Sequence, residues 1–176
     1  MCYGPRIPRQ ARLFPVVLAL LLAAPAFAAE KTVAVFDFEL IDSSLEGSMI
    51  GQNPDEQARL ETMAPALRGN IDTLPGYASV DIAPVRDKAL AQNLESCGNC
   101  ALSFAKTLGA DIAVTGTVQK VSNLILNINA YAFDVKTGQP IARGSADIRS
   151  NTDESWRRGI AYLWKNVLKK QFEAAP

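Results

Sequence analysis

Histidine is absent from the 176 residues of this chain. Ser-His and Cys-His nucleophile systems, His-ligated zinc and c-type haem attachment all need a histidine, so the sequence excludes these sites. No glycine-rich phosphate-binding loop occurs either. The chain therefore offers little known catalytic machinery. We predict neither enzymatic activity nor a cofactor.

Long apolar runs are also scarce. The run "LFPVVLALLLAA" near the N-terminus is too short to span a bilayer, and no later run is longer. Three arginines precede it and Ala26-Phe27-Ala28 follows, which is the pattern of a cleaved signal peptide. We predict that residues 1–28 are a signal peptide and that residues 29–176 form a single α/β domain in the periplasm, without a transmembrane segment. No cysteine follows the run, so no lipid anchor is expected.

A surplus of positive charge is missing too. The chain has 18 basic and 18 acidic residues, and cleavage after Ala28 removes three arginines but no acid. The mature chain then carries 15 basic against 18 acidic residues. Binding to phosphate backbones needs an excess of Lys and Arg, so nucleic acid is not an expected partner.

Only two cysteines remain after cleavage, Cys97 and Cys100, in "ESCGNCALSFAKTL". In an oxidising compartment this C-x-x-C pair is expected to form a disulfide that pins the junction between two helices. The alternative is a thiol-disulfide exchange protein, because a helix N-terminus favours a thiolate. However, the residues before Cys97 look helical, whereas redox folds place a strand there, and Glu95 disfavours a thiolate. Zinc needs four ligands, so it would require two chains.

Apolar and β-branched residues from Lys31 to Leu40 predict a central strand buried on both faces. A long loop follows, and then a helix with Asn53 as N-cap, Pro54 at its first position and Glu56 as capping-box partner. Pro65 lies inside this helical pattern, so we expect a kink or break near it.

The rest of the chain predicts two further helices, a strand meander and a closing helix. Gly109 ends the helix after the cysteines, and Gly116 indicates a bulge or a close backbone approach within a strand. The expected fold is an α/β sandwich on a mixed five-stranded sheet of order β-α-β-α-α-β-β-β-α, parallel in its first half and antiparallel in its second. The expected segments are strands at 77–84, 111–122, 123–135 and 140–149, helices at 85–95 and 101–108, and a last helix opening at 151–154.

The stretch "ALSFAKTLGADIAVTGTVQKVSNLILNINAYAFDVKTGQPIARGSADIR" resembles secreted bacterial domains related to the N-terminal domain of TolB and to CsgG. The segments "FDFELIDSSLEG" and "NTDESWRRG" resemble an exported bacterial family of unknown function. These resemblances imply a TolB N-terminal/CsgG-like fold and an envelope protein that acts by binding or assembly. The chain lacks the lipid-attachment cysteine and the pore-forming insertions of CsgG, so channel formation is not implied.

Acidic residues gather after the first predicted strand. If that strand is regular, Val33, Val35, Asp37 and Glu39 share a face. Together with Asp42 and Glu46, these carboxylates are the metal candidates, suited to a hard cation such as calcium. Solvated acids, or ion-pair partners of the basic last helix, are the commoner explanation. Asp37 and Glu39 are also the one carboxylate pair that could serve a hydrolase as acid and base.

The last helix supplies the partner-binding candidates Trp156, Arg157 and Arg158. Its basic side chains suit an acidic partner or an anionic surface, but a solvated helix face explains them too. Trp156 itself is expected in the core. The predicted function is that of a non-enzymatic periplasmic binding or accessory protein of the cell envelope, acting through protein-protein contacts with another exported or envelope protein. The oligomeric state stays open.

Overall fold

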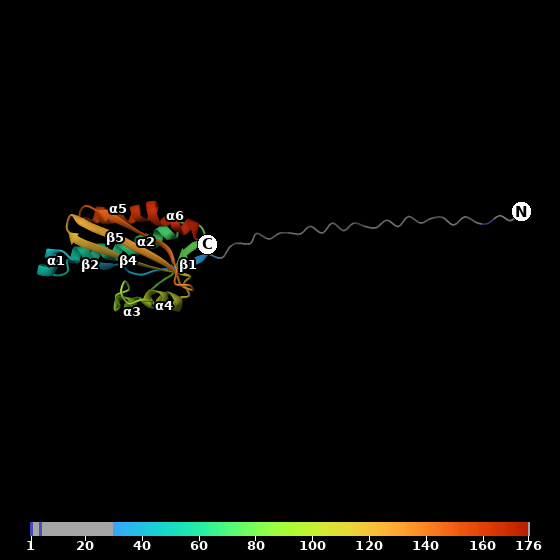
Figure 1. Cartoon of the computed structure of the whole chain (residues 1–176), viewed down its shortest axis with the longest axis horizontal. Helices are drawn as coiled ribbons and strands as arrows, with labels where there is room; N and C mark the ends of the chain where they lie inside the picture. The colour runs from blue at the N-terminus through green and yellow to red at the C-terminus, as the bar shows by residue number, and fades with distance from the viewer. Residues whose placement is uncertain (2–3, 5–29, 176) are drawn as a thin grey trace.

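A mixed β-sheet runs through the middle of the computed structural model, which describes residues 1, 4 and 30–175 (Figure 1). Apart from Met1 and Gly4, the predicted signal peptide lies outside the described residues. The division into a signal peptide and a single domain therefore stays a prediction.

Six strands and six α-helices make up the described part of the chain. The strands are β1 (Lys31–Val35), β2 (Glu39–Asp42), β3 (Tyr77–Ser79), β4 (Ile112–Ser122), β5 (Ile125–Asp134) and β6 (Pro140–Ile148). The helices are α1 (Leu45–Ile50), α2 (Pro54–Ile71), α3 (Arg86–Leu90), α4 (Cys100–Thr107), α5 (Asp153–Leu163) and α6 (Lys169–Ala174), and the π-helical turn η1 (Trp164–Leu168) joins the last two.

The sheet has the strand order β3-β1-β4-β5-β6, and β2 lies beside the far end of β4. Strand β1 pairs in parallel with β3 and with β4, and β2 pairs in parallel with β4. Strands β4, β5 and β6 form an antiparallel meander. The predicted mixed α/β fold is thus confirmed, with six strands in place of five.

The extra strand arises because the predicted strand from Lys31 to Leu40 is split. From Val35 to Glu39 the chain advances four residues while its partner β4 advances three. One extra residue in a strand moves all later side chains to the opposite face. Phe36 accordingly packs on the α3–α4 face, and Phe38 on the α2–α5 face. The prediction that Glu39 shares a face with Val33 and Val35 is therefore wrong.

Helices cover both faces of the sheet (Figure 1). Helices α2, α5 and α6 bury the larger core, which holds Trp156, Leu163 and Phe172. Helices α3 and α4 cover the other face through small side chains such as Ala89, Ala101 and Ala105. Trp156, which was expected in the core, is buried by this packing.

Helix α2 continues past Pro65, so of the expected kink or break the break is wrong, and the kink stays a prediction. Pro65 lies on the solvent side of the helix, while Leu60, Met63 and Leu67 are buried on the other side. Their burial offsets the roughly 3 kcal/mol that an internal proline costs. Asn53 caps the helix as predicted, accepting from the Asp55 N–H at 2.9 Å.

Several loops and turns also differ from expectation. The predicted loop after the first strand contains α1, and the strand expected at 77–84 ends at Ser79. The expected meander strands at 123–135 and 140–149 are joined by a hairpin turn, in which Asp134 accepts from the Thr137 N–H at 2.6 Å and Gly138 has a positive φ. Gly116 is approached by the ring of Phe38, at 2.2 Å from where a Cβ would stand. A side chain therefore explains this glycine, instead of a bulge.

Candidate functional site

The cysteine pair joins the turn after α3 to the start of α4. Cys97 and Cys100 form the predicted disulfide, with Cα atoms 5.8 Å apart. Both side chains are half-buried against the core under α3 and α4. Helix α3 ends at Leu90, so a turn, and neither a helix nor a strand, leads into Cys97.

The metal candidates do not converge on one point. Asp37 accepts from Arg86 Nε at 2.6 Å, and Glu39 accepts from the Leu94 N–H at 2.5 Å, so both lie toward α3. Asp42 lies toward α2 and contacts Lys120. Within residues 30–175, no group of three or more Cys, Asp or Glu side chains is arranged to hold a metal ion.

The partner-binding candidates on α5 border a groove between α2 and α5 of about 930 Å³. Trp156 is 1% exposed and lies at the base of this groove, where its indole N–H donates to Asn151 Oδ1 at 2.9 Å. Arg157 lies on the rim. Arg158 does not line the groove, and its guanidinium is paired with Glu154 at 2.7 Å on the helix surface.

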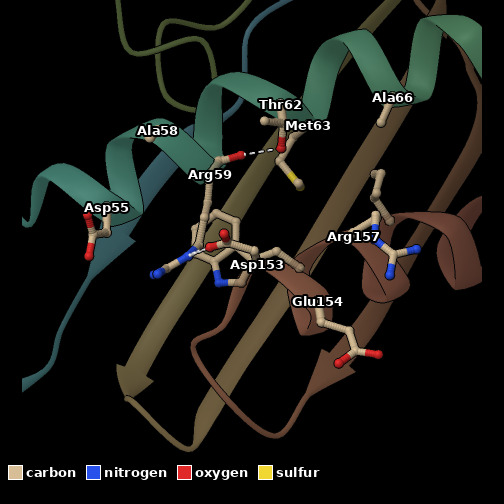
Figure 2. Close-up of a pocket in the computed structure, with 11 residues that line it drawn as sticks. Asp55, Ala58, Arg59, Thr62, Met63, Ala66, Asp153, Glu154 and Arg157 are labelled. Atoms are coloured by element: carbon tan, nitrogen blue, oxygen red, sulfur yellow. Dashed lines mark hydrogen bonds and ion pairs between the residues drawn. The ribbon is translucent and has the colours of Figure 1, made fainter.

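One end of the groove is closed by an ion pair. Figure 2 shows Arg59 of α2 and Asp153 of α5 pointing toward each other, with Nε and Oδ1 2.6 Å apart. Arg59 also donates to Asn151 at 3.3 Å. The pair thus connects the N-terminal part of α2 to the first residue of α5.

Directly behind this ion pair lies a cluster that the sequence analysis missed. We call it the Lys120 network: Lys120, Asp42, Glu46, Glu56, Asn123 and Asn151. The ammonium of Lys120 is 2.6 Å from Glu56 Oε1, 3.3 Å from Asp42 and 3.5 Å from Glu46. Lys120 and Glu56 are each 1% exposed. Burial of such a pair is tolerated only where hydrogen bonds compensate the lost hydration.

Asparagines complete the Lys120 network. Asn151 donates to Glu56 at 2.5 Å and to Asn123 at 3.0 Å, and Asn123 donates to Glu46 at 2.6 Å. These bonds connect the β6–α5 loop, α2, the β4–β5 turn and α1. Glu56 Oε2 is buried without a hydrogen-bond partner among the described residues. Glu56 therefore does not form the predicted capping box, because its carboxylate turns inward to Lys120.

The charges within the Lys120 network stabilise one another. Burial alone would lower the pKa of Lys120, but the hydrogen bond and charge of Glu56, followed by those of Asp42, raise it. Burial would raise the pKa of Asp42, but hydrogen bonds from Ser44 and the contact with Lys120 lower it. Lys120 is thus held as a cation and Asp42 as an anion.

The Lys120 network supports an exposed apolar surface, which we call the apolar end. It consists of seven of the ten exposed large hydrophobic side chains among the described residues: Ile41, Leu45, Met49, Ile50, Val121, Leu124 and Ile125. On α1, the side chains of Leu45, Met49 and Ile50 are 75–80% exposed. Figure 1 places α1 at one tip of the molecule, beyond the end of β2. The bond between Asn123 and Glu46 holds the β4–β5 turn against α1.

Two signals in the sequence pointed to this site. Lys120 stands two residues after buried Val118 in a strand, so alternation places a cation at an inward position. Gly47 in α1 allows close approach, because a Cβ there would stand 2.4 Å from Asp42. The carboxylates that meet Lys120 come from distant segments, so alternation alone did not reveal them.

The family model DUF3280, described as "Protein of unknown function (DUF2380)", matches residues 31–168. The chain belongs to the DUF3280 family. The predicted resemblance to an exported family of unknown function agrees with this assignment. No curated protein matches the chain by sequence.

Solved structures with a similar fold include envelope proteins. The LpoB C-terminal domain from Salmonella enterica has 15% identity and a TM-score of 0.48, covering 72% of this chain and 88% of that chain. Lipoprotein GNA1162 from Neisseria meningitidis has 15% identity and a TM-score of 0.46, covering 69% and 82%. TolB from Acinetobacter baumannii has 11% identity and a TM-score of 0.42, covering 80% and 30%. At these values the likenesses carry no functional argument.

No helix among the described residues is long and apolar enough to cross a membrane.

Proposed function

We propose that this member of the DUF3280 family is a periplasmic, non-enzymatic accessory protein of the cell envelope that binds another exported protein through its apolar end. The predicted signal peptide supports the compartment. The proposal rests on one observation, which is that the exposed large apolar side chains gather on α1 and the β4–β5 turn.

Such a group of exposed apolar side chains is unusual on a surface that binds no partner. Single exposed apolar side chains are ordinary, whereas contiguous apolar patches mark interaction sites. At the apolar end the exposed side chains come from β2, α1 and the β4–β5 hairpin, three segments held together by the Lys120 network. A buried polar network of this kind keeps the apolar side chains in one arrangement before a partner binds.

The charges around the apolar end favour a protein partner with basic residues. Both long helices begin at this end with acidic first turns. Asp55 is exposed, Asp153 and Glu154 are exposed but paired with arginines, and Glu56 is buried against Lys120. Glu46 adds a half-buried carboxylate that shares Lys120 with Asp42 and Glu56, so three acids face one buried cation. Arg149 after β6 is an exposed cation there. An excess of carboxylates is repelled by anionic lipid and attracts a basic protein surface.

Site-specific photo-crosslinking in cells tests the proposal. A photoreactive residue at Met49 or Leu124 is expected to give one adduct of defined mass with another exported protein. Tyr162 on α5 is a matched control, because it is an exposed apolar side chain away from the apolar end. An adduct with a second copy of this chain, equal adducts from all three positions, or no adduct would refute the proposal.

Substitution at the same surface separates binding from folding. Leu45→Ser with Met49→Ser is expected to abolish the adduct formed from Leu124. Both side chains are exposed, so each change should alter the free energy of unfolding by no more than about 0.5 kcal/mol. Urea unfolding of the variant provides the control.

Thiol-disulfide exchange through Cys97 and Cys100 is the alternative. A couple with a reduction potential between about −270 and −120 mV would lie in the oxidoreductase range. Such a potential, together with reduction of a disulfide substrate by the dithiol form, would favour this alternative. We expect neither result.

A further inference from the structure

Strand β2 leaves one of its edges unpaired. Its one neighbour in the sheet is β4, within the described part of the chain. The Ser43 N–H donates to the Lys120 carbonyl at 2.9 Å, which continues this pairing. Backbone groups of successive residues in a strand point to opposite edges. Those of Leu40 and Asp42 therefore point away from β4.

The other two edges of the sheet are capped by side chains. At β3, Asp72 accepts from the Ser79 N–H at 2.6 Å. At β6, Gln171 accepts from the Arg143 N–H at 3.1 Å and donates to the Arg143 carbonyl at 2.9 Å. No side chain from residues 30–175 makes such a bond to Leu40 or to the Asp42 N–H. Since sheet edges are usually protected against pairing, the difference sets β2 apart.

A cavity lies on each face of the sheet at this edge. On the α2 face, a cavity of about 340 Å³ is lined by Leu40, Asp42, Gln57 and Leu60, together with the α1–α2 connection. On the α3 face, a smaller cavity of about 40 Å³ is lined by Asp37, Glu39 and Leu94, among others. Side chains of an added strand alternate between faces, so they would enter these two cavities in turn.

The lining of the two cavities indicates which side chains would fit. The α3 face offers the carboxylate of Glu39, which lines the cavity there. Partial burial, followed by the charge of Glu39, raises the pKa of Glu95, which does not line this cavity. A cation of a partner would relieve this contact between like charges. The α2 face offers the aliphatic surfaces of Leu40 and Leu60.

We propose that the free edge of β2 binds an extended segment of an exported partner protein, in which basic side chains facing Glu39 alternate with aliphatic side chains facing Leu40. The segment pairs with the backbone of Leu40 and Asp42 and extends the sheet by one strand. Strand β2 runs directly into α1, so this edge adjoins the apolar end. The inference rests on the proposed function and specifies its partner.

Amide hydrogen exchange of the mature protein tests the inference, with a blocked heptapeptide of alternating Val and Lys as the probe. Without peptide, the Leu40 and Asp42 amides should exchange much faster than the Ser43 amide, which is bonded to β4. At millimolar peptide, exchange of the first two should slow at least tenfold. A peptide with Glu in place of Lys should have no effect. Unchanged exchange at Leu40 and Asp42 would refute the inference.

Two variants at Leu40 separate the backbone from the side chain. Leu40→Pro and Leu40→Ala both remove the isobutyl group, but only proline removes the edge N–H, and an outward N–H is where an edge strand tolerates proline. Leu40→Pro should weaken peptide binding at least tenfold relative to Leu40→Ala. Equal affinities would contradict pairing through the backbone. Glu39→Gln keeps a side-chain acceptor for Leu94 and should lower affinity for the Lys peptide severalfold; an unchanged affinity would contradict the charge match.

Failure here is distinguishable from failure of the proposed function. Crosslinking from Met49 that persists while Leu40 stays unprotected would refute strand addition and leave the apolar end as the interface. Protection of Leu40 without peptide, rising with protein concentration, would show that a second copy occupies the edge and would also overturn the inference.

Discussion

The Lys120 network makes a sharp prediction about stability. Lys120→Met removes a cation whose Nζ is 2.6 Å from Glu56 Oε1, in a place where both residues are 1% exposed. Glu56 would keep its hydrogen bond from Asn151, but its charge would have no buried counterion. Removing one member of a buried ion pair costs about 3–5 kcal/mol. For a chain of this size such a loss lowers the melting temperature by about 10 °C.

A double-mutant cycle measures the interaction itself. Lys120→Met and Glu56→Leu are each expected to be strongly destabilising, whereas the double variant should lose at least about 2 kcal/mol less than the sum of the two. Urea unfolding followed by tryptophan fluorescence suits the measurement, because the Trp156 indole is bonded to Asn151 beside Glu56.

An exposed ion pair is the matched control. Arg158 and Glu154 are 2.7 Å apart on the surface of α5, with side chains 74% and 60% exposed. Their cycle should give a coupling of no more than about 0.5 kcal/mol, because solvent screens the charges. A loss below about 1 kcal/mol for Lys120→Met, or additive single changes at Lys120 and Glu56, would refute the argument that burial makes this pair strong.

Three further predictions concern pH, close packing and the disulfide. The pKa of Asp42 is lower in the folded protein than in the unfolded chain. Asp42 therefore stabilises the fold above the unfolded pKa of about 3.9, and this contribution is lost as the pH falls through the folded pKa. In urea unfolding between pH 2 and 5, Asp42→Asn should make the free energy of unfolding fall less steeply as the pH is lowered. Gly116→Ala places a Cβ 2.2 Å from the Phe38 ring and should cost about 1–3 kcal/mol, whereas Gly69→Ala, with nothing within 4 Å, should stabilise α2 by up to about 1 kcal/mol; equal melting temperatures would contradict the packing argument. Cys97→Ser should cost about 2 kcal/mol in thermal unfolding and leave the Met49 crosslink intact, so loss of the adduct in a folded variant would contradict a structural disulfide.

Local patterns in the sequence predicted much of the fold. Alternation along the sequence of β5 matches the burial of Leu126, Ile128 and Ala130, and a 3.6-residue period matches the buried side of α5. The hairpin turn at Asp134 and the N-cap at Asn53 depend on neighbouring residues alone, so they too were predictable. The break between β1 and β2 was not predictable from neighbouring residues. It places Phe38 against Gly116, which is 78 residues away in the sequence.

The candidate site was harder to predict than the fold. The acids Asp37, Glu39 and Asp42 are close in sequence and looked like one ligand set. The extra residue between β1 and β2 turns Glu39 to the face opposite Val33 and Val35, toward α3, while Asp42 lies toward α2. The periodic pattern of one strand does not show an extra residue that can be recognised only from its pairing with another strand.

The sequence by itself determined the types of most elements, the two-faced core and the absence of histidine-dependent chemistry, since each of these follows from composition or short-range spacing. Tertiary structure alone decided that Lys120 meets Glu56 and Asp42, that α1 exposes its apolar side chains, and that β2 keeps a free edge. These features depend on contacts between segments distant in sequence, and only the folded chain brings their charges and backbone groups within hydrogen-bonding distance.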